Sequence, residues 1–151
     1  MTITSALVTV ADSISKLVVT GITIKDIDEI PDNAAMLCPI LIPQPNGYIS
    51  DISVEFQSFG SNTGAKIDMD YTLNYVYLHC QAGLGLGTFS IYSGLITKLA
   101  AIIVAILSND AITGLVDMQL QNIGNIGVID DPAGNQYWGV LLSFRVKEFS
   151  Q

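Results

Sequence analysis

Three glycines, Gly83, Gly85 and Gly87, lie between a predicted strand and a predicted helix, where a phosphate-binding loop could form. A Walker loop ends in Gly-Lys-Ser or Gly-Lys-Thr so that its lysine reaches the phosphates, but Gly87 is followed by Thr88. A dinucleotide-binding loop needs the spacing G-x-G-x-x-G and a later acidic partner for the ribose, and the next acidic residue here is Asp110. We therefore interpret the glycines as a turn between strand and helix, with nucleotide binding as the alternative.

Two pairs of carboxylates could coordinate a metal ion or transfer protons. Asp68 and Asp70 fall on the same side of a predicted strand, and Asp130 and Asp131 are adjacent. Both pairs occupy positions that are predicted to be exposed, where solvated carboxylates are the common case. We assign neither pair to a metal site.

Cysteine and histidine supply the remaining candidate metal ligands, which are Cys38, His79 and Cys80. A structural zinc site takes about four such ligands, so no zinc site is predicted. His79 stands in an apolar strand, which favours a packed histidine over a catalytic base, and no serine lies in a G-x-S-x-G motif. The sequence thus predicts no catalytic residue, no metal ligand and no cofactor, and we expect a protein that is not an enzyme.

The chain is apolar, acidic and poor in charge. Of its 151 residues, 50% are hydrophobic and 13% are charged, against about 25% charged residues in soluble proteins. We therefore expect part of its surface to be buried in an oligomer. The 14 acidic and 6 basic residues give a net charge of -8, and without a basic cluster, sequence-specific DNA binding is not expected. The acidic surface serves solubility or repels DNA that passes along it.

Neither a secretory signal nor a membrane-spanning segment is predicted. The N-terminus lacks a basic region followed by an apolar core and a cleavage site. The most membrane-like stretch, Leu95 to Leu107, contains Lys98 and is shorter than the ~20 residues of a spanning helix. We expect an intracellular protein that does not associate with membranes.

The N-terminal part of the chain combines one helix with short strands. Apolar residues at three- and four-residue steps predict an amphipathic helix that begins near Thr4 or Ser5 and ends at Gly21. The acidic segment 26–32 is predicted to be an exposed loop. Cys38 to Ile42 is predicted to be an edge strand, because prolines bound it.

The middle of the chain predicts a hairpin followed by a helix. Alternating apolar residues predict strands at Ile52 to Phe59 and Ile67 to Gln81, joined by a flexible loop at Gly60 to Ala65. The second strand is polar on one side up to Asn74 and apolar on both sides after it, so its loop end should project from the body. From Phe89 to Leu107 the residues are apolar nearly all the way round, which is typical of a helix packed on more than one side.

The C-terminal part predicts a strand at Leu115 to Leu120, a loop at Asn122 to Asn135 and a final strand at Tyr137 to Phe149. Strands that follow one another through turns, with helices at intervals, are typical of α+β domains. The sequence therefore predicts one α+β domain over residues 1–151. It should have an antiparallel or mixed β-sheet, two main helices packed against one face and a projecting β-hairpin.

This order of elements resembles the tail terminator, or tail completion, proteins of long-tailed bacteriophages. The resemblance covers nearly the full chain: the helix Ser5 to Thr20, the strand pair Ile52 to Phe59 and Ile67 to Gln81, the helix Phe89 to Leu107 and the closing strand Tyr137 to Val146. The resemblance rests on the order of the elements and on their apolar and polar patterns, and not on a diagnostic motif. A closely related neck protein is similar to this pattern as well.

The resemblance implies a structural virion protein of the tail or neck that is assembled in the host cytoplasm. Such proteins form a ring, usually a homohexamer, that caps the tail tube, ends its polymerisation and joins the tail to the head. The implied partners are other copies of the chain, the tail tube protein, a head-completion or connector protein, and DNA that passes through the lumen without specific binding. The alternatives are a tail tube or other head-tail connector subunit and a small nucleotide-binding enzyme.

Two sets of residues are candidates for these contacts. The candidate lumen-facing acids are Asp26, Asp28, Glu29, Asp68 and Asp70. The candidate assembly contacts are Phe59, Gly60, Ser61, Asn62, Thr63, Gly64, Lys66, Lys98 and Trp138. Lys98 is the single formal charge between Tyr71 and Asn109, and we expect it to lie at a solvent edge or to pair with an acidic residue.

Overall fold

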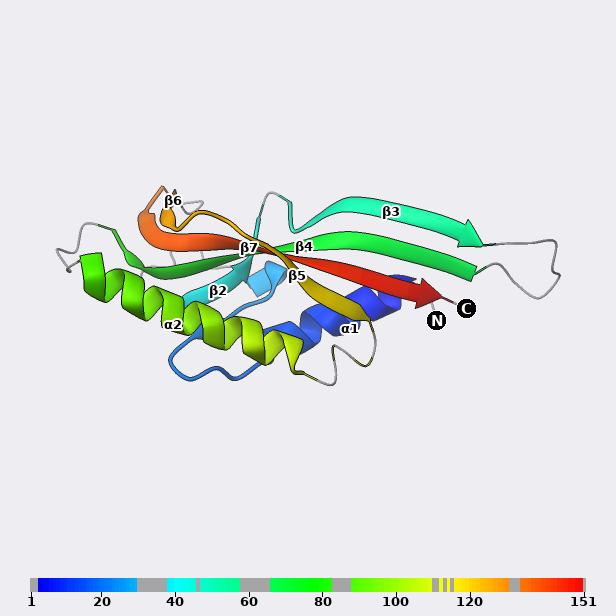
Figure 1. Ribbon diagram of the computed structural model, residues 1–151, viewed down its shortest axis with the longest axis horizontal. Coiled ribbons are helices and arrows are strands. Elements are labelled where there is room, and N and C mark those ends of the chain that lie inside the picture. The colour runs from blue at the N-terminus through cyan, green and yellow to red at the C-terminus, as the bar shows by residue number, and fades with distance from the viewer. Residues whose placement is uncertain are drawn as a thin grey trace.

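The computed structural model describes residues 3–29, 38–45, 47–57, 66–82, 88–109, 112, 114, 116–130 and 134–150. Within these residues the chain forms one mixed sheet of seven strands with two α-helices beside it (Figure 1). This confirms the predicted α+β architecture. In chain order the elements are α1 (Ile3–Ser15), β1 (Thr23–Ile24), the short 3-10 helix η1 (Ile27–Glu29), β2 (Ile40–Pro43), β3 (Ile49–Gln57), β4 (Lys66–Gln81), α2 (Thr88–Leu107), β5 (Asp117–Ile123), β6 (Gly127–Asp130) and β7 (Gln136–Ser150).

Two long strands, β4 and β7, form the centre of the sheet. They pair antiparallel over nearly their whole length, from Ile67 opposite Ser150 to Gln81 opposite Tyr137. The outer edge of each is shared by two shorter strands, β3 and β2 along β4, and β5 and β6 along β7. Among the described strands the one parallel pair is β1 with β2, which makes the sheet mixed.

Both helices pack on the same face of the sheet. Successive residues of a strand point to opposite faces, and the residues of β4 at 71, 73, 75 and 77 share a buried core with residues of α1 and α2 (Figure 1). The buried side of α2 follows helical spacing and contains Ile91, Leu95, Leu99, Ile102 and Ile106. We call the opposite side of the sheet its open face.

The far end of the open face carries a second, smaller core. Val76 and Leu78, which alternate with the core tyrosines of β4, are buried there together with Ile40, Ile42 and Tyr137. The prediction that the second long strand is polar on one side at its start and apolar on both sides at its end is therefore confirmed. The polar half of the open face begins at Asn74 and runs toward the hairpin.

The N-terminal helix is shorter than predicted. It ends at Ser15, whose hydroxyl donates to the Asp12 carbonyl at 2.7 Å, and the expected continuation to Gly21 was wrong. A tight turn takes its place, in which Val19 bridges Ile22 and Gly21 has a φ of 77°. That left-handed conformation is one that glycine adopts readily. The turn reverses the chain so that β1 can reach β2.

Two further predictions were wrong because strand pairing overrides local composition. β2 does not lie at an edge, since β1 pairs with one side of it and β4 with the other. The predicted loop Asn122 to Asn135 contains the end of β5 and all of β6, both of which pair with β7. Glycine and asparagine weaken a strand, but a long neighbour offers these segments a complete row of hydrogen-bonding groups.

The hairpin strands β3 and β4 extend beyond the end of α1 in Figure 1, as predicted. Strand β7 accompanies β4 as far as Ile67, so three strands support this end of the sheet. β3 begins at Ile49, three residues earlier than expected, because the chain continues through a bulge between Ser50 and Ser53. Asp51 in this bulge has a φ of 52°, a conformation that non-glycine residues seldom adopt.

Candidate functional site

The outward side of α2 is an apolar surface that nothing in the described part of the chain covers. It is exposed at Tyr92 (37%), Ile96 (52%) and Val104 (64%), which follow one another at multiples of four residues, and Ala100 between them is exposed as well. We call these residues, with Ser93, Thr97, Ala101 and Ser108, the α2 outer face. Single exposed apolar residues are common, but a contiguous group marks an interaction surface.

Two hydroxyl groups of the α2 outer face are turned back to the helix. Thr97 Oγ1 donates to the Ser93 carbonyl at 2.8 Å, and Ser108 Oγ donates to the Val104 carbonyl at 2.6 Å. A hydroxyl that bonds back to its own helix turns its polar end inward. The surface therefore presents mainly methyl and methylene groups to its surroundings.

A shallow groove continues the α2 outer face toward the turn after α1. Its walls are Val18, Val19 and Thr20 on one side and Ala100, Ala101, Val104 and Ala105 on the other, around a volume of about 550 Å³. Val18 stands at its rim and is 95% exposed. Neither described helix is long and apolar enough to cross a membrane.

Two of the candidate assembly contacts flank this surface. Lys98 is half-buried on α2, and its Nζ lies so close to Gly21 that a Cβ on that glycine would be 2.8 Å away. Among the described residues none forms an ion pair with Lys98, and its side chain is partly exposed. Trp138 stacks edge-on against Tyr92, with ring centroids 5.9 Å apart and an interplanar angle of 79°.

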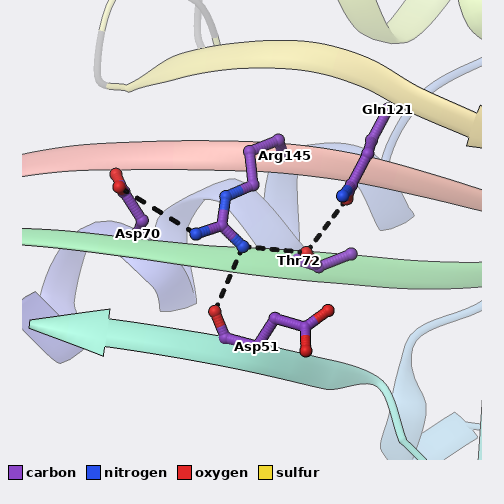
Figure 2. Close-up of polar contacts among 5 residues, drawn as sticks. All are labelled: Asp51, Asp70, Thr72, Gln121 and Arg145. Carbon is purple, nitrogen blue, oxygen red and sulfur yellow. Dashed lines mark hydrogen bonds and ion pairs between the residues drawn. The ribbon is translucent and has the colours of Figure 1, made fainter.

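The polar half of the open face is organised around Arg145 of β7 (Figure 2). Its Nη1 donates to the carbonyl oxygen of Asp51 on β3 and to Thr72 Oγ1 on β4, both at 3.1 Å. Thr72 in turn donates to Gln121 Oε1 on β5 at 3.0 Å. The guanidinium thus joins three strands, and the carbonyl that the Asp51 bulge presents becomes one of its acceptors. We call these residues, with Asp70, the Arg145 cluster.

Asp70 contributes a weak ion pair to the Arg145 cluster. Its Oδ2 lies 3.9 Å from Arg145 Nη2, and the two side chains are 37% and 34% exposed. Pairs at such exposure contribute little to stability. Asp70 Oδ1 is itself buried and accepts no hydrogen bond. A polar hollow of about 220 Å³ opens beside it, lined by Asp70, Asp117, Gln119, Arg145 and Lys147.

A second polar group holds the strands together next to the cluster. Asn74 Nδ2 donates to the Gly47 carbonyl and to Ser50 Oγ, both at 2.8 Å. Asn74 Oδ1 accepts from Ser143 Oγ at 2.7 Å. Since three of its neighbours are thus bonded to one amide, this part of the open face is rigid and internally satisfied.

Replacing Arg145 by methionine should destabilise the fold, because the Asp51 carbonyl and the buried Thr72 hydroxyl lose their donor. We expect a loss of about 1–3 kcal/mol in the free energy of unfolding, measured by urea denaturation. Lys147→Met is the matched control on the same strand, where an exposed charge should contribute less than about 1 kcal/mol. Equal losses for the two variants would contradict a bridging role for Arg145.

The four candidate lumen-facing acids whose side chains the structure describes fall into two separate groups. Asp26 and Asp28 line a hollow of about 710 Å³ beside α1, together with Asp12 and Tyr48, and Glu29 Oε1 accepts from the Asp26 amide at 3.2 Å. Tyr48 belongs to the core under the helices, so this group lies on the helix side. Asp70 lies on the open face. The structure does not bring the acids together on one surface.

Asp68 lies in β4, two residues before Asp70, and its side chain is outside the described residues. The same holds for the side chain of Lys66, which opens β4. Phe59, Gly60, Ser61, Asn62, Thr63 and Gly64 lie outside the described residues altogether, as does the Gly83 to Gly87 turn.

His79 is a packed residue beneath α2. Its Nδ1 is 2.8 Å from the Tyr77 hydroxyl, and a Cβ on Gly94 of α2 would come within 3.2 Å of its Nε2. Burial, together with the positive charge of Lys98, lowers the pKa of His79. Burial also raises the pKa of the Cys80 thiol. Within the described residues no group of three or more His, Cys, Asp or Glu side chains is placed to hold a metal ion.

The chain matches no model of a known protein family, and no curated protein is similar enough in sequence to count as a relative.

Proposed function

We propose that this protein is a structural virion subunit of the tail terminator type, which assembles with copies of itself into a ring that caps the tail tube and joins the tail to the head. The α2 outer face is the observation that carries this proposal. A long uncharged surface with Ile96 and Val104 exposed lowers the solubility of a monomer. The same surface is suited to a lasting contact with a neighbouring subunit.

The charge of the chain supports self-association through this surface. With a net charge of -8, two copies repel each other wherever their acidic surfaces meet. The α2 outer face carries no charged residue, so copies that meet there avoid this repulsion. The groove beside Val18 would accept part of the neighbour.

We propose that the open face lines the lumen of the ring, through which the DNA passes. Arg145 Nη1 donates to Asp51 and Thr72, and the guanidinium lies beside Asp70, so its positive charge is partly offset and is held within the sheet. Asp70 and the exposed Asp117 add negative charge that disfavours DNA contact. The proposed partners at the two ends of the ring are a tail tube protein and a head-completion or connector protein.

The oligomeric state of the purified protein tests the proposal. Sedimentation velocity and negative-stain images should reveal one closed ring of discrete mass, near six copies. Raising the salt concentration from about 0.05 to 0.5 M should increase the ring fraction, because salt screens the repulsion between acidic copies and leaves apolar contacts intact. An assembly held by ion pairs would respond in the opposite direction.

Two outcomes would overturn the proposal. A protein that stays monomeric at high concentration in both salt conditions would remove the assembly role. Open tubes of indefinite length would identify a tail tube subunit in place of a terminator, since a ring closes and a tube does not.

A further inference from the structure

Glu148 is a carboxylate placed inside the core. It lies on β7 opposite Met69 of β4 and two residues after Val146, a residue of the main core. It therefore points to the helix side, and it is 3% exposed. Helix α1 contacts β7, and Figure 1 places the start of α1 beside the C-terminal end of β7. The helix thus covers the end of the strand that carries this acid.

The buried carboxylate has one polar neighbour, the Tyr71 hydroxyl. Both carboxylate oxygens and this hydroxyl are buried and none of them forms a hydrogen bond of good geometry, but the hydroxyl is close enough to influence the carboxyl. The nearest sheet positions on the same face are apolar: Met69 lies opposite Glu148, Val146 lies two residues before it, and Met118 lies opposite Val146. Buried carboxylates are normally paired, so this one is exceptional.

Among the described side chains, no cation faces Glu148 from the surrounding elements. On α1 the one titratable side chain is Asp12, which pairs with Lys16 at 2.9 Å in solvent. On the neighbouring strands Asp70, Asp117 and Lys147 line the hollow of the open face, which is the other side of the sheet. Tyr71 is the single titratable neighbour on the helix side of β4 that is close enough to affect the carboxyl.

Burial raises the pKa of Glu148, and the nearby Tyr71 hydroxyl offsets this in part. This raised pKa makes the stability of the closed structure depend on pH. An acid whose pKa is higher in the closed structure stabilises that structure below its ordinary pKa, and this contribution is lost as the pH rises through the raised value. If α1 moved away, the carboxylate would return to water, and the free-energy cost of burying its charge would be removed.

We propose that α1 is a pH-sensitive cover, which closes over Glu148 when the carboxyl is protonated and loosens from the end of the sheet when it ionises. The loosened helix uncovers the apolar surface around Tyr71, Val146 and Met118, which a neighbouring subunit or another partner of apolar character can then contact. This inference is independent of the proposed ring, because it concerns the isolated chain.

Hydrogen exchange of the α1 amides between about pH 5 and pH 8 tests the inference. After correction for intrinsic exchange, protection of α1 should fall with rising pH, by about tenfold for each unit of pKa shift. Protection of α2 should stay constant and serves as the internal reference. In Glu148→Gln, which keeps the shape but cannot ionise, α1 protection should be independent of pH.

Two further variants separate this effect from general ones. Asp117→Asn removes an exposed carboxylate of β5 and should leave the pH dependence of α1 as in the unmodified protein. Tyr71→Phe removes the hydroxyl but keeps the acid, and so the pH dependence should persist. If Glu148→Gln retained the pH dependence, or if α1 protection in the unmodified protein did not change with pH, the inference would be overturned.

Discussion

Replacing both Ile96 and Val104 by aspartate is expected to convert the assembled protein into monomers that remain folded. The two side chains are 52% and 64% exposed, so they contribute little to the core. Each neighbour in the assembly would gain two negative charges at an uncharged contact. Like charges placed opposite each other cost several kcal/mol, and each 1.4 kcal/mol is about a tenfold change in affinity. We expect the dissociation constant to rise by at least about a hundredfold.

The control for this variant adds the same charge elsewhere. Gln119→Asp with Asn122→Asp places two carboxylates at exposed positions of β5, away from α2. It should assemble like the unmodified protein in sedimentation velocity. Aspartate inside a helix costs up to about 0.7 kcal/mol per residue, so only a modest loss in thermal stability should accompany the α2 variant. If the β5 variant dissociated and the α2 variant assembled, the contact would lie on the open face.

Gly139→Ala is expected to destabilise the fold strongly. A Cβ at this position would clash with the carbonyl oxygen of Tyr77 and would lie 3.2 Å from side-chain atoms of Ile129 and Leu78. The first of these is backbone of the central strand and cannot move without disturbing the β4–β7 pairing. We expect a loss of at least about 3 kcal/mol in the free energy of unfolding, measured by urea denaturation, as for overpacked cores.

Gly127 provides a matched control for Gly139. The two residues face each other across the β6–β7 pair, but a Cβ on Gly127 would have no atom within 4 Å. Gly127→Ala should therefore be neutral or stabilise the fold by up to about 1 kcal/mol through the unfolded chain. Our interpretation of the close contact at Gly139 would fail if the two variants unfolded at the same urea concentration.

The long elements could be predicted from the sequence because each has an unambiguous period. In β4 the alternation of Tyr71, Leu73 and Tyr75 with polar residues identifies both the strand and its buried side. In α2 a long apolar run without proline identifies the helix, although the run contains Gly94. Its nearly uniform apolar character hides which side is buried, and the sheet decides that by contacting Leu95 and Ile102.

The predictions of secondary structure were wrong where an element depends on residues that are distant in the sequence. Val128 and Ile129 favour a strand, but the glycine and asparagine residues before them are typical of a loop, and β6 forms because β7 lies alongside it. The α1 prediction extended to Gly21 because Leu17 and Val18 continue the apolar period, although the structure exposes Val18 almost fully. The tight turn around Gly21 already includes Val19, so the helix ends several residues before the apolar repeat does.

The Arg145 cluster could not have been predicted without the register of the sheet. Arg145 is one of three charged residues in its strand, with Lys147 and Glu148, and its opposition to Thr72 depends on how β4 and β7 align. Glu148 can be recognised more easily from the sequence. It occupies the same alternating positions as Leu142, Phe144 and Val146, all of which are buried, and a charge in an apolar series is a sign of an unusual site.

The central pairing of β4 with β7 also determines when this protein can fold. Every paired position, from Gln81 with Tyr137 to Ile67 with Ser150, joins residues that are far apart in the chain. Contacts of long sequence separation form slowly, because loop closure precedes any stabilising contact. During synthesis β2, β3, β4 and both helices emerge while β7, the second central strand of their sheet, is still missing. The apolar core therefore closes only after β7 has been made, and until then the nascent chain depends on protection from aggregation.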